Sequence, residues 1–242
     1  MLRFDLHVHS KYSYDSLMEP SGIVKEAKKK GLKGIAVTDH NTIKGAIEAA
    51  GYAGEDFFVI VGSEISTPEA EILGLFLKED VPPGPSKEVI KKIRDQGGLA
   101  VLAHPYKRRS EISPALLREL DGIEVFNSRG ERSFFSSCNK KALALAEEYG
   151  MAGTAGSDAH FLSEIGRGGI EIENADGIDA VRDRIKAGGC ATYGRTAPLF
   201  AEFSSQSVRA AKLRNPLIFI KALLRIVYAP FAGFFKIGDG YR

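Results

Sequence analysis

Residues 4–40 read FDLHVHSKYSYDSLMEPSGIVKEAKKKGLKGIAVTDH and contain one complete strand–helix–strand unit. Residues 4–9 and 34–38 are short, largely apolar runs, which is typical of buried strands. Residues 21–30 between them have the spacing of an amphipathic helix and are followed by Gly31, a common helix stop. Two strands joined through a helix usually lie parallel in one sheet, so this stretch predicts an α/β fold.

The same rhythm of a short apolar run followed by a helical segment continues along the chain. Further strands are predicted at 57–61, 99–103, 123–126, 151–155 and 190–193, and further helices at 42–50, 86–96, 114–120, 134–149 and 178–187. Residues 72–77 are predicted to be an added strand or the arm of a hairpin, and residues 169–172 an accessory strand. Seven strand–helix units around a parallel sheet predict an incomplete TIM-like barrel, with a doubly wound open sheet as the alternative.

The composition is that of an average soluble globular protein, with 44% hydrophobic and 26% charged residues among 242. It excludes a disordered or fibrous protein. The two cysteines, Cys138 and Cys190, cannot form a disulfide framework or a zinc-binding CxxC pair. A net charge of +2 does not favour a protein that wraps nucleic acid. No apolar leader follows Met1, and with so few cysteines we expect a cytoplasmic protein.

The chain divides into two predicted domains. Residues 1–200 contain no linker and are expected to form the barrel, whereas residues 201–242 are expected to form an amphipathic helical tail. Pro216 opens an apolar segment in which Lys221 and Arg225 share one helical face. We expect this helix to pack on the barrel or on a second subunit of a homo-oligomer. The alternative is a helix that lies on a membrane surface, whereas its two charges do not favour a transmembrane span.

Side chains that can bind metal gather where the predicted strands end. His7 and His9 end the first strand, and because residues i and i+2 point to the same face, both imidazoles project together. Asp158 and His160 repeat this spacing after a later strand. The other imidazole and carboxyl groups in such positions are Asp15, Asp39, His40, Glu64, His104 and Glu124. All five histidines of the chain belong to this set.

This clustering favours a metal site over structural histidines. A lone histidine at a strand end usually only makes a hydrogen bond, but here each one lies beside a carboxylate or a second histidine. Mixed imidazole and carboxylate ligands suit Zn²⁺, Mn²⁺ or Fe²⁺. The set is too large for one tetrahedral zinc, so we expect two or three divalent ions, with Glu64 able to bridge two of them.

Five short motifs carry a resemblance to a known family. They are Asp5-Leu6-His7-Val8-His9-Ser10, Thr38-Asp39-His40-Asn41, Gly62-Ser63-Glu64-Ile65-Ser66, Ala103-His104-Pro105 and Gly156-Ser157-Asp158-Ala159-His160. In this order, over residues 3–195, the chain resembles the PHP (polymerase and histidinol phosphatase) superfamily. The resemblance implies a distorted (β/α)7 TIM-like barrel that holds a di- or trinuclear metal centre for phosphoester hydrolysis.

The resemblance also implies how the ligands are divided among the ions. The first ion would be held by His7, His9, Glu64 and Asp158, the second by Glu64 and His104, and the third by Asp15, His40 and His160. Related members carry a histidine just before an Ile-Leu-Gly run, where this chain has Glu71. Glu71 is therefore a predicted ligand of the second ion that would alter its metal preference, or else a solvated strand residue.

These features predict a stand-alone, metal-dependent phosphoesterase in which a metal-activated water attacks phosphorus. His104, Asp158 and His160 are the candidate catalytic residues for proton transfer. Arg129 and Arg195 follow predicted strand ends and are candidates for phosphate binding.

The predicted substrate is a nucleotide, a sugar phosphate or the end of a short oligonucleotide. The alternative is a catalytically weak protein that keeps its metals and binds a phosphorylated ligand or partner in a regulatory role, and the departure at Glu71 keeps it open. A metal-dependent amidohydrolase is a more distant alternative, because it expects a metal-bridging lysine at a strand end and none is placed there.

Overall fold

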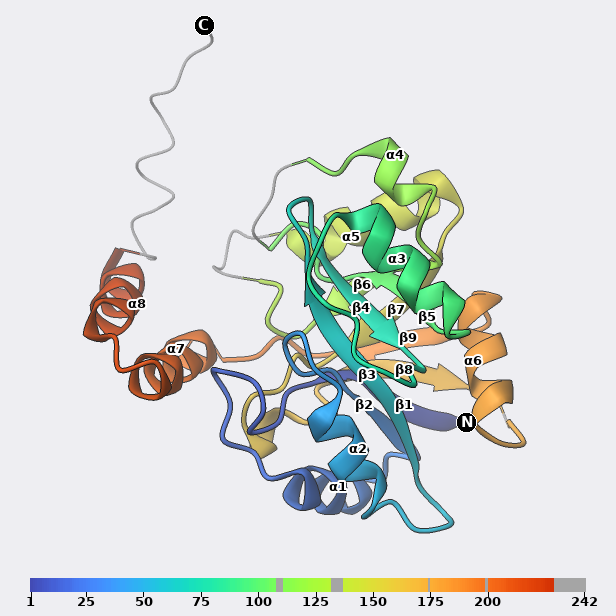
Figure 1. The fold of residues 1–242 in the computed structure, drawn as a ribbon, viewed down its shortest axis with the longest axis horizontal. Helices are drawn as coiled ribbons and strands as arrows, with labels where there is room; N and C mark the ends of the chain where they lie inside the picture. The colour runs from blue at the N-terminus through green and yellow to red at the C-terminus, as the bar shows by residue number, and fades with distance from the viewer. Residues whose placement is uncertain (108–110, 132–136, 174, 199, 229–242) are drawn as a thin grey trace, which may run out of the picture.

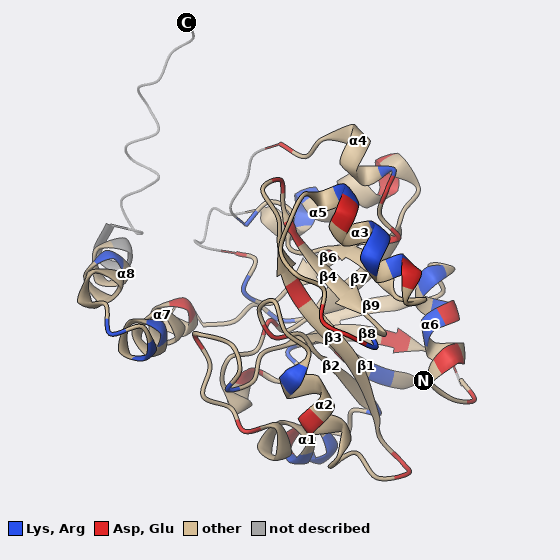
Figure 2. Cartoon of the chain, in the orientation of Figure 1, with Lys and Arg blue, Asp and Glu red and all other residues tan. Residues whose placement is uncertain are grey.

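The computed structural model of the protein describes residues 1–107, 111–131, 137–173, 175–198 and 200–228. Its centre is a strongly curved sheet with helices on the outside, and two C-terminal helices lie at one side (Figure 1). Charged side chains lie mainly on the outer helices and loops, whereas the strands carry few (Figure 2). The predicted α/β barrel with a C-terminal helical extension is confirmed.

Every predicted strand forms, with its ends shifted by a few residues. The strands are β1 (Leu2–Val8), β2 (Gly34–Val37), β3 (Phe58–Ser66), β4 (Glu71–Leu75), β5 (Leu99–Leu102), β6 (Gly122–Asn127), β7 (Ala152–Gly156), β8 (Gly168–Ile172) and β9 (Ala191–Gly194). The helices are α1 (Pro20–Lys29), α2 (Lys44–Ala50), α3 (Ser86–Asp95), α4 (Pro114–Leu117), α5 (Cys138–Tyr149), α6 (Ile178–Lys186), α7 (Phe200–Lys212) and α8 (Pro216–Tyr228), with a 3₁₀ turn, η1, at Leu162–Glu164. The predicted start of the fifth helix, residues 134–136, lies outside the described residues.

The sheet is mixed rather than uniformly parallel, which corrects one expectation. Its strand order is β7-β6-β5-β4-β3-β2-β1-β8-β9. The accessory strands β4 and β8 run antiparallel to their neighbours inside this sheet. For β4 the reason is local, because a connection of only four residues after β3 leaves no room for a crossover. The sheet nearly closes where Val8 bridges Ala159 next to β7.

Apolar side chains alternate between two layers, because both faces of the strands are buried. In β5, Leu99 and Val101 join the inner cluster with Phe4, whereas Ala100 and Leu102 pack beneath the outer helices. Such double burial fixes the positions of the strand ends, and with them the loops that carry the polar motifs.

A bulge in β1 changes which way the first motif faces. In the pairing with β2, Asp5 lies opposite Ile35 and Val8 opposite Val37, so β1 contains one extra residue. As a result Leu6 packs in the inner cluster, whereas Val8 packs against α1 and α2 in the outer one. Bulges re-aim side chains near functional sites, and this one lies directly at His7.

The C-terminal tail consists of two helices. The predicted apolar helix is α8, and α7 lies between it and the barrel (Figure 1). The exposed apolar side chains of α8 include Leu217, Ile220 and Leu224. Within the described residues, no helix is both long and apolar enough to cross a membrane. The division at residue 200, the homo-oligomer and the membrane surface stay predictions.

Candidate metal centre

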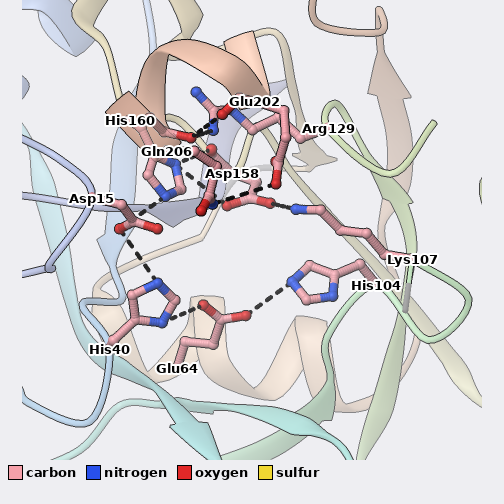
Figure 3. Close-up of a pocket in the computed structure, with 11 residues that line it drawn as sticks. Asp15, His40, Glu64, His104, Lys107, Arg129, Asp158, His160, Glu202 and Gln206 are labelled. Atoms are coloured by element: carbon pink, nitrogen blue, oxygen red, sulfur yellow. Dashed lines mark hydrogen bonds and ion pairs between the residues drawn. The ribbon is translucent and has the colours of Figure 1, made fainter. Parts of the chain in front are cut away.

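The structure brings all nine predicted metal ligands to one end of the sheet. His7 and Glu64 lie in strands β1 and β3, and Glu71 begins β4. The remaining ligands lie in the connections after strands, and they are His9, Asp15, His40, His104, Asp158 and His160. Apart from Glu71, whose side chain is 18% exposed, these side chains are at most 7% exposed. Most of them surround one pocket (Figure 3).

Glu64 lies at the middle of the cluster. Its Oε1 is 2.9 Å from His104 Nε2, and its Oε2 is 3.0 Å from His40 Nδ1. The same Oε2 lies 3.6 Å from His7 Nε2 and 3.5 Å from His9 Nε2. Each carboxylate oxygen therefore faces imidazole nitrogens on its own side, which is the arrangement a bridging carboxylate needs.

His7 and His9 present their Nε2 atoms to each other and to Asp158. The two nitrogens are 3.1 Å apart, and Asp158 Oδ1 lies 3.7 Å from the first and 3.3 Å from the second. Two imidazoles on one tetrahedral zinc would hold their nitrogens about 3.3 Å apart, given Zn–N distances of about 2.0–2.1 Å. The donor atoms thus lie at ligand spacing.

A third group forms around Asp15. Its Oδ1 is 3.5 Å from His40 Nε2 and 3.2 Å from His160 Nε2. Asp15 Oδ1 and both ring nitrogens of His40 are buried, yet none makes a hydrogen bond of acceptable geometry with the described residues. Buried donors and acceptors are rarely left in this state, and a cation between Asp15 Oδ1 and His40 Nε2 would satisfy these two atoms, while His40 Nδ1 faces Glu64 Oε2.

Four overlapping sets of ligand atoms have the compactness that a metal ion requires. They are His9/Asp15/His40/His160, His7/His9/Asp158, His7/His104/Glu124 and Glu64/Glu71/His104. Together with the unsatisfied atoms of His40, these buried sets fit metal binding.

Hydrogen bonds from outside the cluster orient the imidazoles. Glu124 Oε1 lies 3.0 Å from His7 Nδ1, and Ser13 Oγ lies 2.9 Å from His9 Nδ1. The main-chain oxygen of Asp158 accepts from His160 Nδ1 at 2.8 Å. Because each Nδ1 has a partner, each Nε2 is left to face the centre, which is a common arrangement around metal-binding histidines.

Glu71 lies at the edge of this centre. Its Oε2 is 3.9 Å from His104 Nδ1, on the side of the ring away from the Glu64 contact. Glu71 forms one of the compact ligand sets with Glu64 and His104, and its role as a metal ligand stays a prediction.

The backbone is strained at the motifs. Asn41, His104 and Asp158 have positive φ angles of 58°, 24° and 54°. Non-glycine residues adopt such angles at a cost, and where they gather, the surrounding structure usually holds functional side chains in place.

Carboxylates dominate the electrostatics of the site. Burial opposes a charge on His40, but Glu64 and Asp15 outweigh it and raise the pKa of His40 to about 10. At His7 burial is likewise outweighed, by Glu124, Asp158 and Glu64, so its pKa is raised well above the usual value. Burial and the neighbouring His160 lower the pKa of His9 to about 3. The cluster therefore draws positive charge to itself.

Lysine and arginine supply part of that charge. Lys107 is buried with its Nζ 2.5 Å from Asp158 Oδ2. Arg129 lines the same pocket, donating from Nε and Nη2 to Glu164 and from Nη1 to Ser205. Arg195 is exposed after β9 and does not line this pocket. The predicted phosphate-binding roles of both arginines stay predictions.

The sequence did not point to α7 as part of the site. Glu202, Ser205 and Gln206 of this helix line the pocket together with the predicted ligands (Figure 3). No local motif marks these residues, because long-range contacts such as the one between Arg129 and Ser205 place them there. Lys107 also lines this pocket, and its partner Asp158 is 51 residues away in the chain.

Comparison with known proteins agrees with this geometry. A family model described as the PHP domain matches residues 5–161, and a second, described as PHP-associated, matches residues 137–190. An uncharacterized protein of Methanocaldococcus jannaschii is 48% identical over 144 residues, which cover 52% of this chain and 82% of that protein.

Solved structures of the same fold include the following two proteins. A Bacteroides vulgatus protein named for a predicted PHP-like metal-dependent phosphoesterase domain has a TM-score of 0.65 at 20% identity, over 80% of this chain and 65% of that one. A candidate metal-dependent phosphoesterase from Bifidobacterium adolescentis has a TM-score of 0.60 at 20% identity, and the match covers 77% of this chain and 96% of that one. The likeness of these structures shows the shared fold, and the match over residues 5–161 shows the family: the chain belongs to the PHP domain family.

Proposed function

We propose that this protein hydrolyses phosphoesters with the help of two or three divalent ions, Zn²⁺, Mn²⁺ or Fe²⁺. The observation that supports this most is the set of buried, mutually facing imidazole and carboxylate atoms around Glu64. Ions bound there would lower the pKa of a water molecule and neutralise charge on the phosphoryl oxygens.

The ligand atoms divide among the ions as their spacing suggests. The first ion would be held by His7, His9, Glu64 and Asp158, the second by Glu64, Glu71 and His104, and the third by Asp15, His40 and His160. His9 also lies within reach of the third set. Glu64 would bridge the first and second ions, because its Oε2 faces His7 and His9 and its Oε1 faces His104.

Residues of this chain would also position and neutralise the substrate. The ammonium of Lys107 and the guanidinium of Arg129, paired with Asp158 and Glu164, lie next to the ligands and so would add positive charge beside a phosphoryl group bound at the edge of the pocket. His104, Asp158 and His160 are the groups through which a proton would leave the attacking water or reach the leaving group. Arg195 would contact the substrate only outside this pocket, because its side chain is exposed.

The proposed substrates are nucleotides, sugar phosphates and the ends of short oligonucleotides. The test is metal analysis of the purified protein followed by a turnover screen of such phosphoesters. We expect bound divalent metal, loss of turnover on chelation, and recovery with Mn²⁺ or Zn²⁺. Full metal occupancy with no turnover on any phosphoester would instead favour a regulatory protein that binds a phosphorylated ligand. Unchanged turnover after exhaustive chelation would contradict metal-dependent hydrolysis.

A further inference from the structure

Helix α7 covers one side of the candidate metal centre. It begins at Phe200, beyond the residues 5–161 and 137–190 that the two family models match. Its residue Ser205 is 1% exposed, and its Oγ accepts a hydrogen bond of 2.9 Å from Arg129 Nη1. Part of the wall of the site is therefore built by a segment that the family motifs do not include.

Two basic side chains hold α7 to the loop after β1. Lys212 Nζ donates to the main-chain oxygens of Lys11, Ser13 and Ser16 at 2.6–2.7 Å. The bonds tie the last turn of α7 to the loop that carries Asp15.

The second contact reaches the metal ligands through an aromatic ring. The guanidinium of Arg209 lies 4.5 Å from the centre of the Tyr14 ring. Tyr14 in turn stacks on His40, with ring centres 4.2 Å apart and planes 4° apart. A cation over an aromatic face is attractive, so this stack fixes α7 directly above the third ligand group.

With α7 in this position, little space is left beneath it. The pocket between α7 and the ligands has a volume of about 10 Å³, which is room for roughly one water molecule. If a substrate carried a second organic group on its phosphorus, pointing toward α7, that group would collide with Glu202, Ser205 and Gln206.

A larger space borders the centre at Glu71. This groove has a volume of about 330 Å³, which is the size of a small-ligand site. Its lining includes the hydroxyl residues Ser66 and Thr67, the apolar Ala70 and Ile112, and Glu71. His104 lines both the groove and the pocket under α7, so the groove reaches the metal centre directly.

The geometry points to α7 as a selectivity element, and we propose that it limits the protein to phosphates at the end of their substrate. The organic part of the substrate would lie in the groove beside Glu71, among hydroxyl and apolar groups suited to a sugar or nucleoside. An internal phosphodiester carries chain on both sides of phosphorus and needs a second exit, which α7 closes. This inference rests on the proposed phosphoesterase function.

The experiment compares three probes with the Mn²⁺-loaded, full-length protein. They are p-nitrophenyl phosphate, a linear oligonucleotide with a 5′-phosphate, and a single-stranded DNA circle of the same sequence, which has no end. We expect phosphate to be released from the first two probes. Cleavage of the circle should be at least about 100-fold slower than this release, because the site cannot admit an internal phosphodiester.

Two variants assign the selectivity to α7 and to the groove. The double variant Arg209→Ala, Lys212→Ala loosens α7, and we expect cleavage of the circle to rise at least about tenfold relative to p-nitrophenyl phosphate. Its matched control is Lys221→Ala, which removes a cation from α8. Ser66→Trp fills the groove and should raise the KM for the oligonucleotide end more than that for p-nitrophenyl phosphate, whereas Ser66→Ala should not.

The outcomes separate this inference from the function on which it rests. Cleavage of the circle by the unmodified protein within about tenfold of the terminal reaction would overturn the selectivity role and leave the phosphoesterase standing. Circle cleavage unchanged in the double variant would likewise overturn the role of α7. No turnover on any probe, with metal bound, would contradict the proposed function itself.

Discussion

The histidine–carboxylate cluster and helix α7 border the same pocket but are built in different ways. The cluster comes from strand ends, and apart from Glu71 its side chains are at most 7% exposed and are held by hydrogen bonds among themselves. Helix α7 follows the last strand and is held by a few contacts such as Arg129–Ser205 and Lys212 with the loop after β1. If the protein is the proposed phosphoesterase, the sheet would hold the groups that carry the chemistry, whereas the added helix would decide which substrates reach them.

If this contrast is right, substitutions at the centre of the cluster should abolish activity, whereas substitutions at its edge or in α7 should only alter metal preference or substrate selectivity. The largest effect is expected for Glu64→Gln, which keeps the shape but removes the charge that faces four histidines. We expect bound metal to fall and turnover to drop by about 1000-fold, or ~4 kcal/mol of transition-state stabilisation. Metal analysis and kcat measure both, and Glu147→Gln on the exposed face of α5 is the control. Retention of full metal content and turnover would refute the central role of Glu64.

The next effect concerns stability and depends on metal. Lys107→Met leaves the buried Asp158 without its ammonium partner, which in metal-free protein should cost about 3 kcal/mol. Bound metal would neutralise the same carboxylate, so the loss should shrink when Mn²⁺ is present. Urea unfolding with and without metal measures the difference, with Lys92→Met on α3 as the control. An equal loss in both conditions would mean that Asp158 does not bind metal.

Glu124→Gln tests the outer hydrogen bonds of the cluster. Glu124 contacts His7 Nδ1 at 3.0 Å, and loss of such a partner usually lowers metal affinity about 10- to 100-fold. We expect weaker metal binding in a direct titration, with the fold intact by circular dichroism. Unchanged affinity would show that Glu124 does not orient this histidine.

Glu71→His should have the smallest effect. Because Glu71 lies at the edge of the cluster and is partly exposed, the change should shift metal preference toward zinc, by about tenfold or less, without abolishing binding. Competition between Zn²⁺ and Mn²⁺ measures this. If both Glu71→His and Glu71→Ala leave metal content and preference unchanged, Glu71 is only a solvated strand residue.

Much of the cluster could be predicted because its information is local. The spacing of His7 and His9, and of Asp158 and His160, follows from the two-residue period of a strand. Burial on both faces then brings the strand ends together, which is why separate motifs meet at Glu64.

What escaped prediction depends on contacts that no short stretch encodes. Strand β8 is visible as an apolar run, but its antiparallel pairing with β1 joins distant parts of the chain and is not encoded in the run itself. The bulge at His7 leaves no mark in the hydrophobic pattern. The role of Ser205 depends on Arg129, which is 76 residues earlier in the chain.

The most direct test of the central claim follows metal occupancy and turnover together. Metal-free protein is titrated with Mn²⁺ or Zn²⁺ while hydrolysis of p-nitrophenyl phosphate is recorded in the same samples. We predict no turnover without metal, a rise in turnover as the sites fill, and saturation at two or three ions per chain. The variant Glu64→Gln should bind less metal and show little turnover. Turnover that is already complete in metal-free protein, or that stays at zero when the sites are full, would contradict the account.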